Sequence, residues 1–112
     1  MTEITKLSKD AAEIIAAAMG VRAEDILSKK RGGWVVSDSR FILYTVMAEE
    51  GYEHAEIGRA IGGRDRTSVL HGITELKSRR GLLQAEKRLV RALLEVEKIY
   101  PIMWGDEVQS PV

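Results

Sequence analysis

Apolar residues recur at intervals of three and four along almost the whole chain, which is the spacing of α-helices with one buried face. The run "WVV" at 34–36 has the residue types of a β-strand. No second segment of that kind is available to pair with it, and a strand needs partners to be stable. The spacing therefore predicts an all-α fold of about six helices.

Capping residues and glycines divide this pattern into helices. The first three helices are expected at 8–19, where Ser8 is the cap and Gly20 the stop, at 23–28, and from near Asp38 to Gly51. The fourth is expected at about 53–61 and the last at about 82–99. The fifth lies between them and ends near Arg80, and its buried residues are Val69, Leu70, Ile73 and Leu76. A basic loop with paired glycines is expected at about 29–37. Residues 1–100 are expected to form one domain, with a C-terminal tail at 101–112.

Composition narrows the class of protein. The 112 residues include no cysteine, which excludes disulfides and thiolate metal sites and fits a reducing compartment. There is no apolar run near the ~20 residues of a membrane span, and no secretory leader. We therefore expect a soluble, cytoplasmic protein. The 17 basic and 17 acidic residues balance, so any binding to nucleic acid must rely on a local basic patch.

Residues 54–80 have the organisation of a helix-turn-helix, with two short helices joined by a tight turn that contains glycine. Gly58 has no side chain and would let the two helices cross closely. Gly62 and Gly63 can take the positive φ angles of a sharp turn. We expect the complete motif at about 53–80.

The turn leads into "GGRDRTSVLHG" at 62–72, in which a polar string precedes the apolar anchors. In helix-turn-helix proteins the second helix enters the major groove with its N-terminal residues against base edges. Arginine can donate to guanine, aspartate can accept from cytosine, and threonine offers a hydroxyl or a methyl contact. The candidate DNA contacts on this helix are Arg64, Asp65, Arg66, Thr67 and Ser68. The candidate contacts to the DNA backbone are Lys29, Lys30, Arg31 and Arg40.

Structural roles compete with these functional ones. Asp65 can simply cap the fifth helix, and capping and base reading can operate together. Lys29–Arg31 on their own could be a solvated loop, but their place before a helix-turn-helix favours DNA binding. His71 is expected to be a packed, hydrogen-bonded histidine. Three basic residues either touch the DNA backbone or complement the dipole of the fifth helix: Lys77, Arg79 and Arg80.

Two segments, "ILSKKR" at 26–31 and "AEIGRAIGGRDRTSVLHG" at 55–72, resemble the C-terminal DNA-binding domain of the bacterial replication initiator DnaA. The signature of that family runs Gly-Gly-Arg-Asp-His-Thr-Thr-Val-Leu-His. It is preceded by a Glu-Ile-Gly motif and, at the same distance as here, by Leu-Leu-Ser-Lys-Arg-Arg. The resemblance covers about residues 8–95. It implies a Trp-repressor-like helical domain that binds double-stranded DNA as a monomer.

Position by position, this chain has some of the residues that the family uses to read DNA. Arg66 stands where the family has histidine, which implies a different base-reading contact. Gly33 stands where the family has an arginine for the minor groove, and residues 37–40 read Ser-Asp-Ser-Arg in place of Arg-Pro-Arg-Gln. By the resemblance, these changes affect the residues that would read the minor groove and the family's own DNA-binding box. Three residues fall on family positions at the start of the recognition helix: Asp65, Thr67 and Ser68.

The sequence has no Gly-x-x-x-x-Gly-Lys-Ser/Thr loop, so we expect no bound nucleotide and none of an initiator's ATPase activity. The N-terminal methionine and the C-terminal tail favour a free-standing small protein. No grouping of nucleophile, base or metal ligands is evident. We therefore expect no cofactor, no metal and no enzymatic activity.

The leading hypothesis is a sequence-preferring double-stranded DNA-binding protein, a DnaA-like regulator of transcription or replication associated with the nucleoid. The alternative is a protein–protein adaptor that keeps the fold but has weak or no DNA binding. The zero net charge, the altered loop and the broad apolar face of the last helix motivate this alternative. That face could also join two copies into a homodimer.

Overall fold

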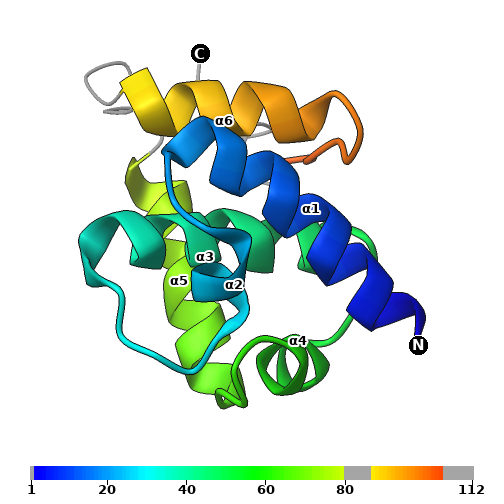
Figure 1. The fold of residues 1–112 in the computed structure, drawn as a ribbon. Helices are drawn as coiled ribbons and strands as arrows, with labels where there is room; N and C mark the ends of the chain where they lie inside the picture. The colour runs from blue at the N-terminus through cyan, green and yellow to red at the C-terminus, as the bar shows by residue number, and fades with distance from the viewer. Residues whose placement is uncertain (1, 80–86, 105–112) are drawn as a thin grey trace.

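The computed structural model describes residues 2–79 and 87–104, and this part of the chain folds into six α-helices without a strand (Figure 1). The all-α prediction is therefore confirmed. None of the helices in these two ranges is long and apolar enough to cross a membrane. The helices are α1 Glu3–Met19, α2 Ala23–Leu27, α3 Gly33–Glu49, α4 His54–Ala60, α5 Arg66–Arg79 and α6 Lys87–Glu97.

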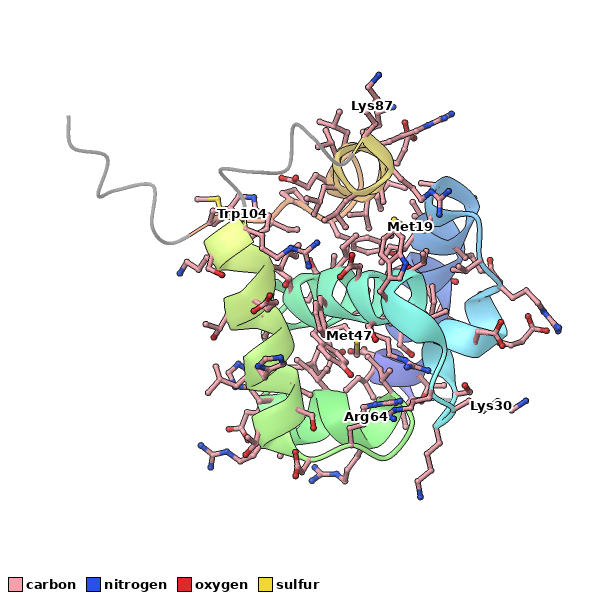
Figure 2. The ribbon with its side chains drawn as sticks, turned by 90° about the vertical axis from the view of Figure 1, so that its left-hand side faces the viewer. Met19, Lys30, Met47, Arg64, Lys87 and Trp104 are labelled. Carbon is pink, nitrogen blue, oxygen red and sulfur yellow. The ribbon has the colours of Figure 1, made fainter. Side chains whose placement is uncertain are left out.

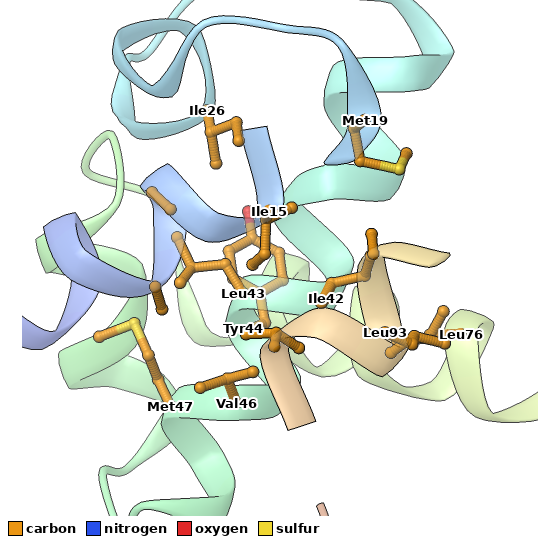
Figure 3. Close-up of a cluster of buried hydrophobic side chains, with 14 of the residues drawn as sticks. Ile15, Met19, Ile26, Ile42, Leu43, Tyr44, Val46, Met47, Leu76 and Leu93 are labelled. Carbon is orange, nitrogen blue, oxygen red and sulfur yellow. The ribbon is translucent and has the colours of Figure 1, made fainter. Parts of the chain in front are cut away.

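Helix α3 runs through the centre of the molecule, with α1 and α6 on one side and α4 and α5 on the other (Figure 1). It is buried on nearly every face between Val36 and Met47, as expected of a helix that others surround. Ile42 and Leu43 are fully buried against residues of α1, α5 and α6 (Figure 3). Burying side chains of this size stabilises a fold by about 1.5–3 kcal/mol each.

The first helix begins earlier than its sequence suggests. The Thr2 side chain is the cap, because its hydroxyl accepts from the Thr5 backbone N–H at 3.3 Å. Ser8 is not a cap, since it lies buried within α1 and its hydroxyl donates to the Thr5 carbonyl at 2.9 Å. Gly20 ends the helix as predicted, with a left-handed φ of 75°.

The third helix also begins earlier, at Gly33 instead of near Asp38, so the "WVV" segment is helical. Asp38 does not cap a helix. Its carboxylate accepts two hydrogen bonds from the Arg79 guanidinium, at 2.9 and 3.3 Å, and joins α3 to α5. The basic loop is therefore shorter than the predicted 29–37 and lies between Leu27 and Gly33.

The chain after α6 continues along the body of the protein. Ile102 is buried, and the Met103 backbone N–H donates to the Glu49 carboxylate at 3.1 Å. Residues 101–104, the first part of the expected C-terminal tail, therefore contact the domain. The predicted start of the last helix at 82–86 and the rest of the tail at 105–112 lie outside the described residues.

Candidate nucleic-acid interface

Helices α4 and α5 form the predicted helix-turn-helix. Gly62 and Gly63 both have left-handed φ angles, 74° and 67°, as the sharp turn requires. The Arg64 backbone N–H then donates to the Gly58 carbonyl at 2.8 Å. A Cβ atom at Gly58 would lie 2.1 Å from the Arg64 carbonyl oxygen, so only glycine permits this close crossing. The expected roles of all three glycines are confirmed.

The tip of α5 projects from this rigid turn. Arg66, Thr67 and Ser68 are exposed, and Val69 directly after them is fully buried. The polar string therefore faces solvent while the next residue anchors the helix to the core. Leu70, predicted to be buried, is 46% exposed because it lies on the outward face of α5.

Asp65 caps α5, as one of its two predicted roles requires. Its Oδ1 accepts from the Ser68 backbone N–H at 2.9 Å. Hydrogen bonds from the Ser68 backbone and side chain lower the pKa of the Asp65 carboxyl group. The carboxylate remains exposed and charged, so the cap also places a negative charge at the tip of the helix.

Arg64 lies between the turn and the basic loop, with its guanidinium directed at the loop backbone (Figure 2). It donates to the carbonyl oxygens of Ser28 and Ile61, each at 3.0 Å, and of Lys29 at 3.4 Å. The bond to Ser28 joins residues that lie 36 positions apart in the sequence. Arg64 therefore fixes where the basic loop lies relative to the helix-turn-helix.

Arg40, a predicted contact to the DNA backbone, lies mostly inside the protein. Its side chain is only 5% exposed. Burial, and then the nearby positive charge of Arg64, lower the pKa of the Arg40 guanidinium. The residue thus holds the basic loop from inside the protein. Its Nε and Nη2 atoms donate to four carbonyl oxygens: Ile26 at 2.9 Å, Asp25 at 2.6 Å, Ser28 at 3.1 Å and Lys30 at 2.7 Å.

Lys29, Lys30 and Arg31 are all exposed. The carbonyl groups of Lys29 and Lys30 accept from the two arginines within the protein. The Lys30 side chain extends away from the body at the outer edge of the loop (Figure 2). The loop therefore carries three exposed cations, and hydrogen bonds from Arg40 and Arg64 hold its backbone.

A hollow of about 450 Å³ separates α3 from the tip of α5. Sequence reasoning missed the three rings that line it, those of Phe41, Tyr44 and His71, and the first two belong to an apolar helical stripe. His71 is exposed and contacts the Phe41 ring edge-on, with ring centroids 6.0 Å apart. The expectation of a packed, hydrogen-bonded histidine is therefore wrong. The remaining lining residues are Ser37, Arg40, Arg64, Asp65, Thr67 and Ser68.

Helices α3 and α5 are in close contact beside this hollow. Gly72 on α5 faces the rings of Phe41 and Tyr44, and a Cβ atom there would lie 2.6 and 2.8 Å from them. The Asp38–Arg79 ion pair joins the same two helices nearer the C-terminal end of α5. Helix α5 is thus held to α3 at Gly72 and at Arg79. Within residues 2–79 and 87–104, no group of three acidic, histidine or cysteine residues could hold a metal ion.

Comparison with known proteins agrees with this geometry. The family model described as "Bacterial dnaA protein helix-turn-helix" matches residues 9–76. The chromosomal replication initiator protein DnaA of Xanthobacter autotrophicus is 29% identical over 90 residues, which are 80% of this chain and 17% of that protein. The DnaA protein of Brucella abortus is 31% identical over 80 residues, 71% of this chain and 16% of that protein.

The chain therefore spans less than a fifth of the length of these relatives. No solved structure gives a significant match to the chain. The matched segment contains the basic loop, α3, α4 and α5 as far as Leu76. The chain belongs to the family of the bacterial DnaA helix-turn-helix, a family of domains that bind double-stranded DNA.

Proposed function

We propose that this protein binds double-stranded DNA with a preference for particular sequences, and that α5 enters the major groove. The observation that carries the proposal is the tip of α5. Arg66, Thr67 and Ser68 are exposed on a helix whose next residue, Val69, is fully buried. Specific readout needs side chains that reach base edges from a rigid support, and this arrangement supplies both.

The basic loop provides the contacts to the DNA backbone in this proposal. Lys29, Lys30 and Arg31 would neutralise phosphates on the strand beside the groove that α5 enters. With about five phosphate contacts in total, log affinity should fall with log salt at a slope near −4 to −5. Arg64 contributes by fixing the loop and the turn in one register, since it donates to both.

The biological role proposed is regulation of replication or transcription at the nucleoid. It rests on the similarity to chromosomal replication initiator proteins. The interface needs no cofactor, metal or nucleotide, and we propose no catalytic activity for it. Binding as a monomer is part of the proposal.

Selection from a random duplex library, followed by gel shifts at several salt concentrations, tests this function. The proposal expects an enriched motif and binding that weakens steeply with salt. No enriched duplex together with no salt-sensitive binding would refute it.

A protein–protein adaptor is the second candidate. Three large apolar side chains near the C-terminal end of the described chain are exposed: Leu94 at 60%, Ile99 at 59% and Met103 at 74%. Exposed apolar groups of this size favour a protein contact. Light scattering of the free protein would show whether they join two copies. A palindromic selected site would indicate that a dimer binds DNA.

A further inference from the structure

The hollow between α3 and the tip of α5 contains two arginines, Arg40 and Arg64, that form no ion pair within the described chain. Arg40 and Arg64 donate only to backbone carbonyl oxygens, and neither forms an ion pair there. Their charges lie close enough for Arg64 to lower the pKa of Arg40. Two arginines and one carboxylate, that of Asp65, line the hollow, so its lining carries a net positive charge although Asp25 also acts on Arg40.

Some donor groups of the two arginines remain unused. A guanidinium has five N–H groups. Arg64 uses three of them on the carbonyls of Ser28, Ile61 and Lys29. Arg40 uses Nε and Nη2, and no hydrogen bond from its Nη1 is formed within the described part. Both side chains line the hollow.

Tyr44 brings a third donor to the same place. Only 2% of the surface of Tyr44 is exposed. Its hydroxyl makes no hydrogen bond to the residues that the structure describes. Every polar side-chain atom there that is closed off from solvent does have a partner. The hydroxyl is therefore not closed off from solvent, and Tyr44 is one of the residues that line the hollow. Burial raises the pKa of Tyr44, so the phenol keeps its proton at neutral pH.

The N-terminus of α5 does not supply the binding groups itself. Asp65 already accepts the first-turn N–H of Ser68, and its carboxylate is exposed at the edge of the hollow. The hydroxyls of Thr67 and Ser68 lie at the same edge. The unused donors come instead from α3 and from the turn, beneath the tip of the recognition helix.

We propose that this hollow is a phosphate subsite in which Tyr44, Arg40 and Arg64 donate to one phosphodiester group of the bound DNA strand. This inference rests on the proposed DNA binding. A strand that passes between the basic loop and α5 crosses the hollow, because Arg64 contacts the loop backbone and lines the hollow as well. The phosphate supplies the missing negative charge, and it positions the tip of α5 in the groove without reading a base.

The test compares wild type, Tyr44→Phe and the matched control Tyr100→Phe on the selected duplex. Each phosphate of the duplex is replaced in turn by an uncharged methylphosphonate. Phenylalanine keeps the ring packing, and the Tyr44 hydroxyl makes no described bond, so Tyr44→Phe should fold with an unchanged Tm. Tyr100 lies beyond α6 and away from the hollow, and burial, then Asp10 and Glu50, raise its pKa.

A hydrogen bond to a charged group corresponds to about tenfold or more in affinity. We expect Tyr44→Phe to weaken all duplexes about tenfold with no change in the salt slope, because the lost group is neutral. One methylphosphonate position should weaken wild type strongly and Tyr44→Phe much less, while the other positions affect both alike. Tyr100→Phe should behave as wild type.

Tyr44→Phe with the affinity and the methylphosphonate profile of wild type would overturn the subsite and leave the proposed DNA binding standing. Absence of duplex binding by wild type would instead remove the proposed function, and the subsite with it. A third measurement uses inorganic phosphate without DNA. If it raises the Tm of wild type but not of Tyr44→Phe, and no phosphate position in the duplex is sensitive, the hollow binds a free ion and the DNA assignment is wrong.

Discussion

The guanidinium groups of Arg40 and Arg64 both donate to one acceptor, the carbonyl oxygen of Ser28, at 3.1 and 3.0 Å. Arg40 comes from α3 and Arg64 from the turn of the helix-turn-helix. The loop that carries Lys29, Lys30 and Arg31 is therefore tied to both elements at a single point. This shared acceptor sets the distance between the cations of the loop and the tip of the recognition helix.

Arg40→Met should lower the free energy of unfolding, because it leaves the carbonyl groups of Ile26 and Lys30 without their donor. The expected loss is at least about 1–3 kcal/mol, the cost of one unpaired buried group. DNA affinity should fall as well, since the loop is no longer held. Arg31→Met is the control, because Arg31 is exposed and should change the unfolding free energy by less than about 0.5 kcal/mol. Denaturant unfolding distinguishes them, and equal stability of the two variants would contradict the role of Arg40.

Arg64→Ala should loosen the basic loop while the core helices remain intact. The loop amides at 28–31 should then exchange hydrogen faster, whereas the amides of α1 should not change. The physical reason is the loss of the bonds to Ser28 and Lys29. Hydrogen exchange followed by mass spectrometry measures this. Unchanged exchange at 28–31 would show that other contacts hold the loop.

Gly58→Ala should destabilise the protein by about 1–3 kcal/mol or more, the usual cost of forcing an extra group into a packed site. The new methyl group would meet the backbone carbonyl of Arg64, which cannot move without opening the turn. Gly63→Asn is a matched control in the same turn. It has open space around the Cβ position, and asparagine tolerates the left-handed φ of 67°. Thermal unfolding should separate the two, and equal Tm values would contradict the close crossing.

The cap formed by Asp65 predicts a dependence of stability on acid pH. Because the folded-state pKa of Asp65 is lowered, its contribution is fully present above the unfolded-state pKa and is lost as pH falls through the folded-state pKa. Asp65→Asn keeps a capping oxygen without a titrating charge. Below about pH 4, the free energy of unfolding of this variant should therefore depend less steeply on pH than that of wild type. An identical acid profile for wild type and Asp65→Asn would show that the cap contributes nothing through its charge.

The fold was predictable where a local pattern determines it. The period of the apolar residues predicted the helices, and Gly58, Gly62 and Gly63 predicted the turn. The start of α3 was not predictable in this way, because two glycines and two β-branched valines precede Asp38 and all are poor helix formers. Packing of Val36 against the core and the ion pair of Asp38 with Arg79 outweigh these local preferences.

The candidate site was predictable in part, for a similar reason. Exposed residues at the helix tip and in the basic loop were found from their position in the motif. Arg40 and Arg64 were predicted only as DNA contacts, whereas within the protein they bind backbone carbonyls up to 15 and 36 residues away. Such partners leave no pattern in the sequence. Tyr44 was counted only as part of an apolar face, and its hydroxyl at the hollow became evident only once α3 and α5 were placed together.

The loop and the helix tip should respond differently to mutation. Lys30→Ala should weaken binding to every duplex alike and reduce the magnitude of the salt slope by about 1, because it removes one phosphate contact. Fluorescence anisotropy at several salt concentrations, with specific and scrambled duplexes, measures both quantities. A sequence-dependent loss would mean that Lys30 reads bases.

Base reading by the tip of α5 is the central claim, and Arg66→Ala tests it most directly. Competition between the selected duplex and a scrambled one should be measured for wild type and variant at the same salt concentration. The account predicts that Arg66→Ala loses about 1–3 kcal/mol of preference for the selected duplex. Its affinity for the scrambled duplex should fall much less. Unchanged discrimination by Arg66→Ala would contradict the account.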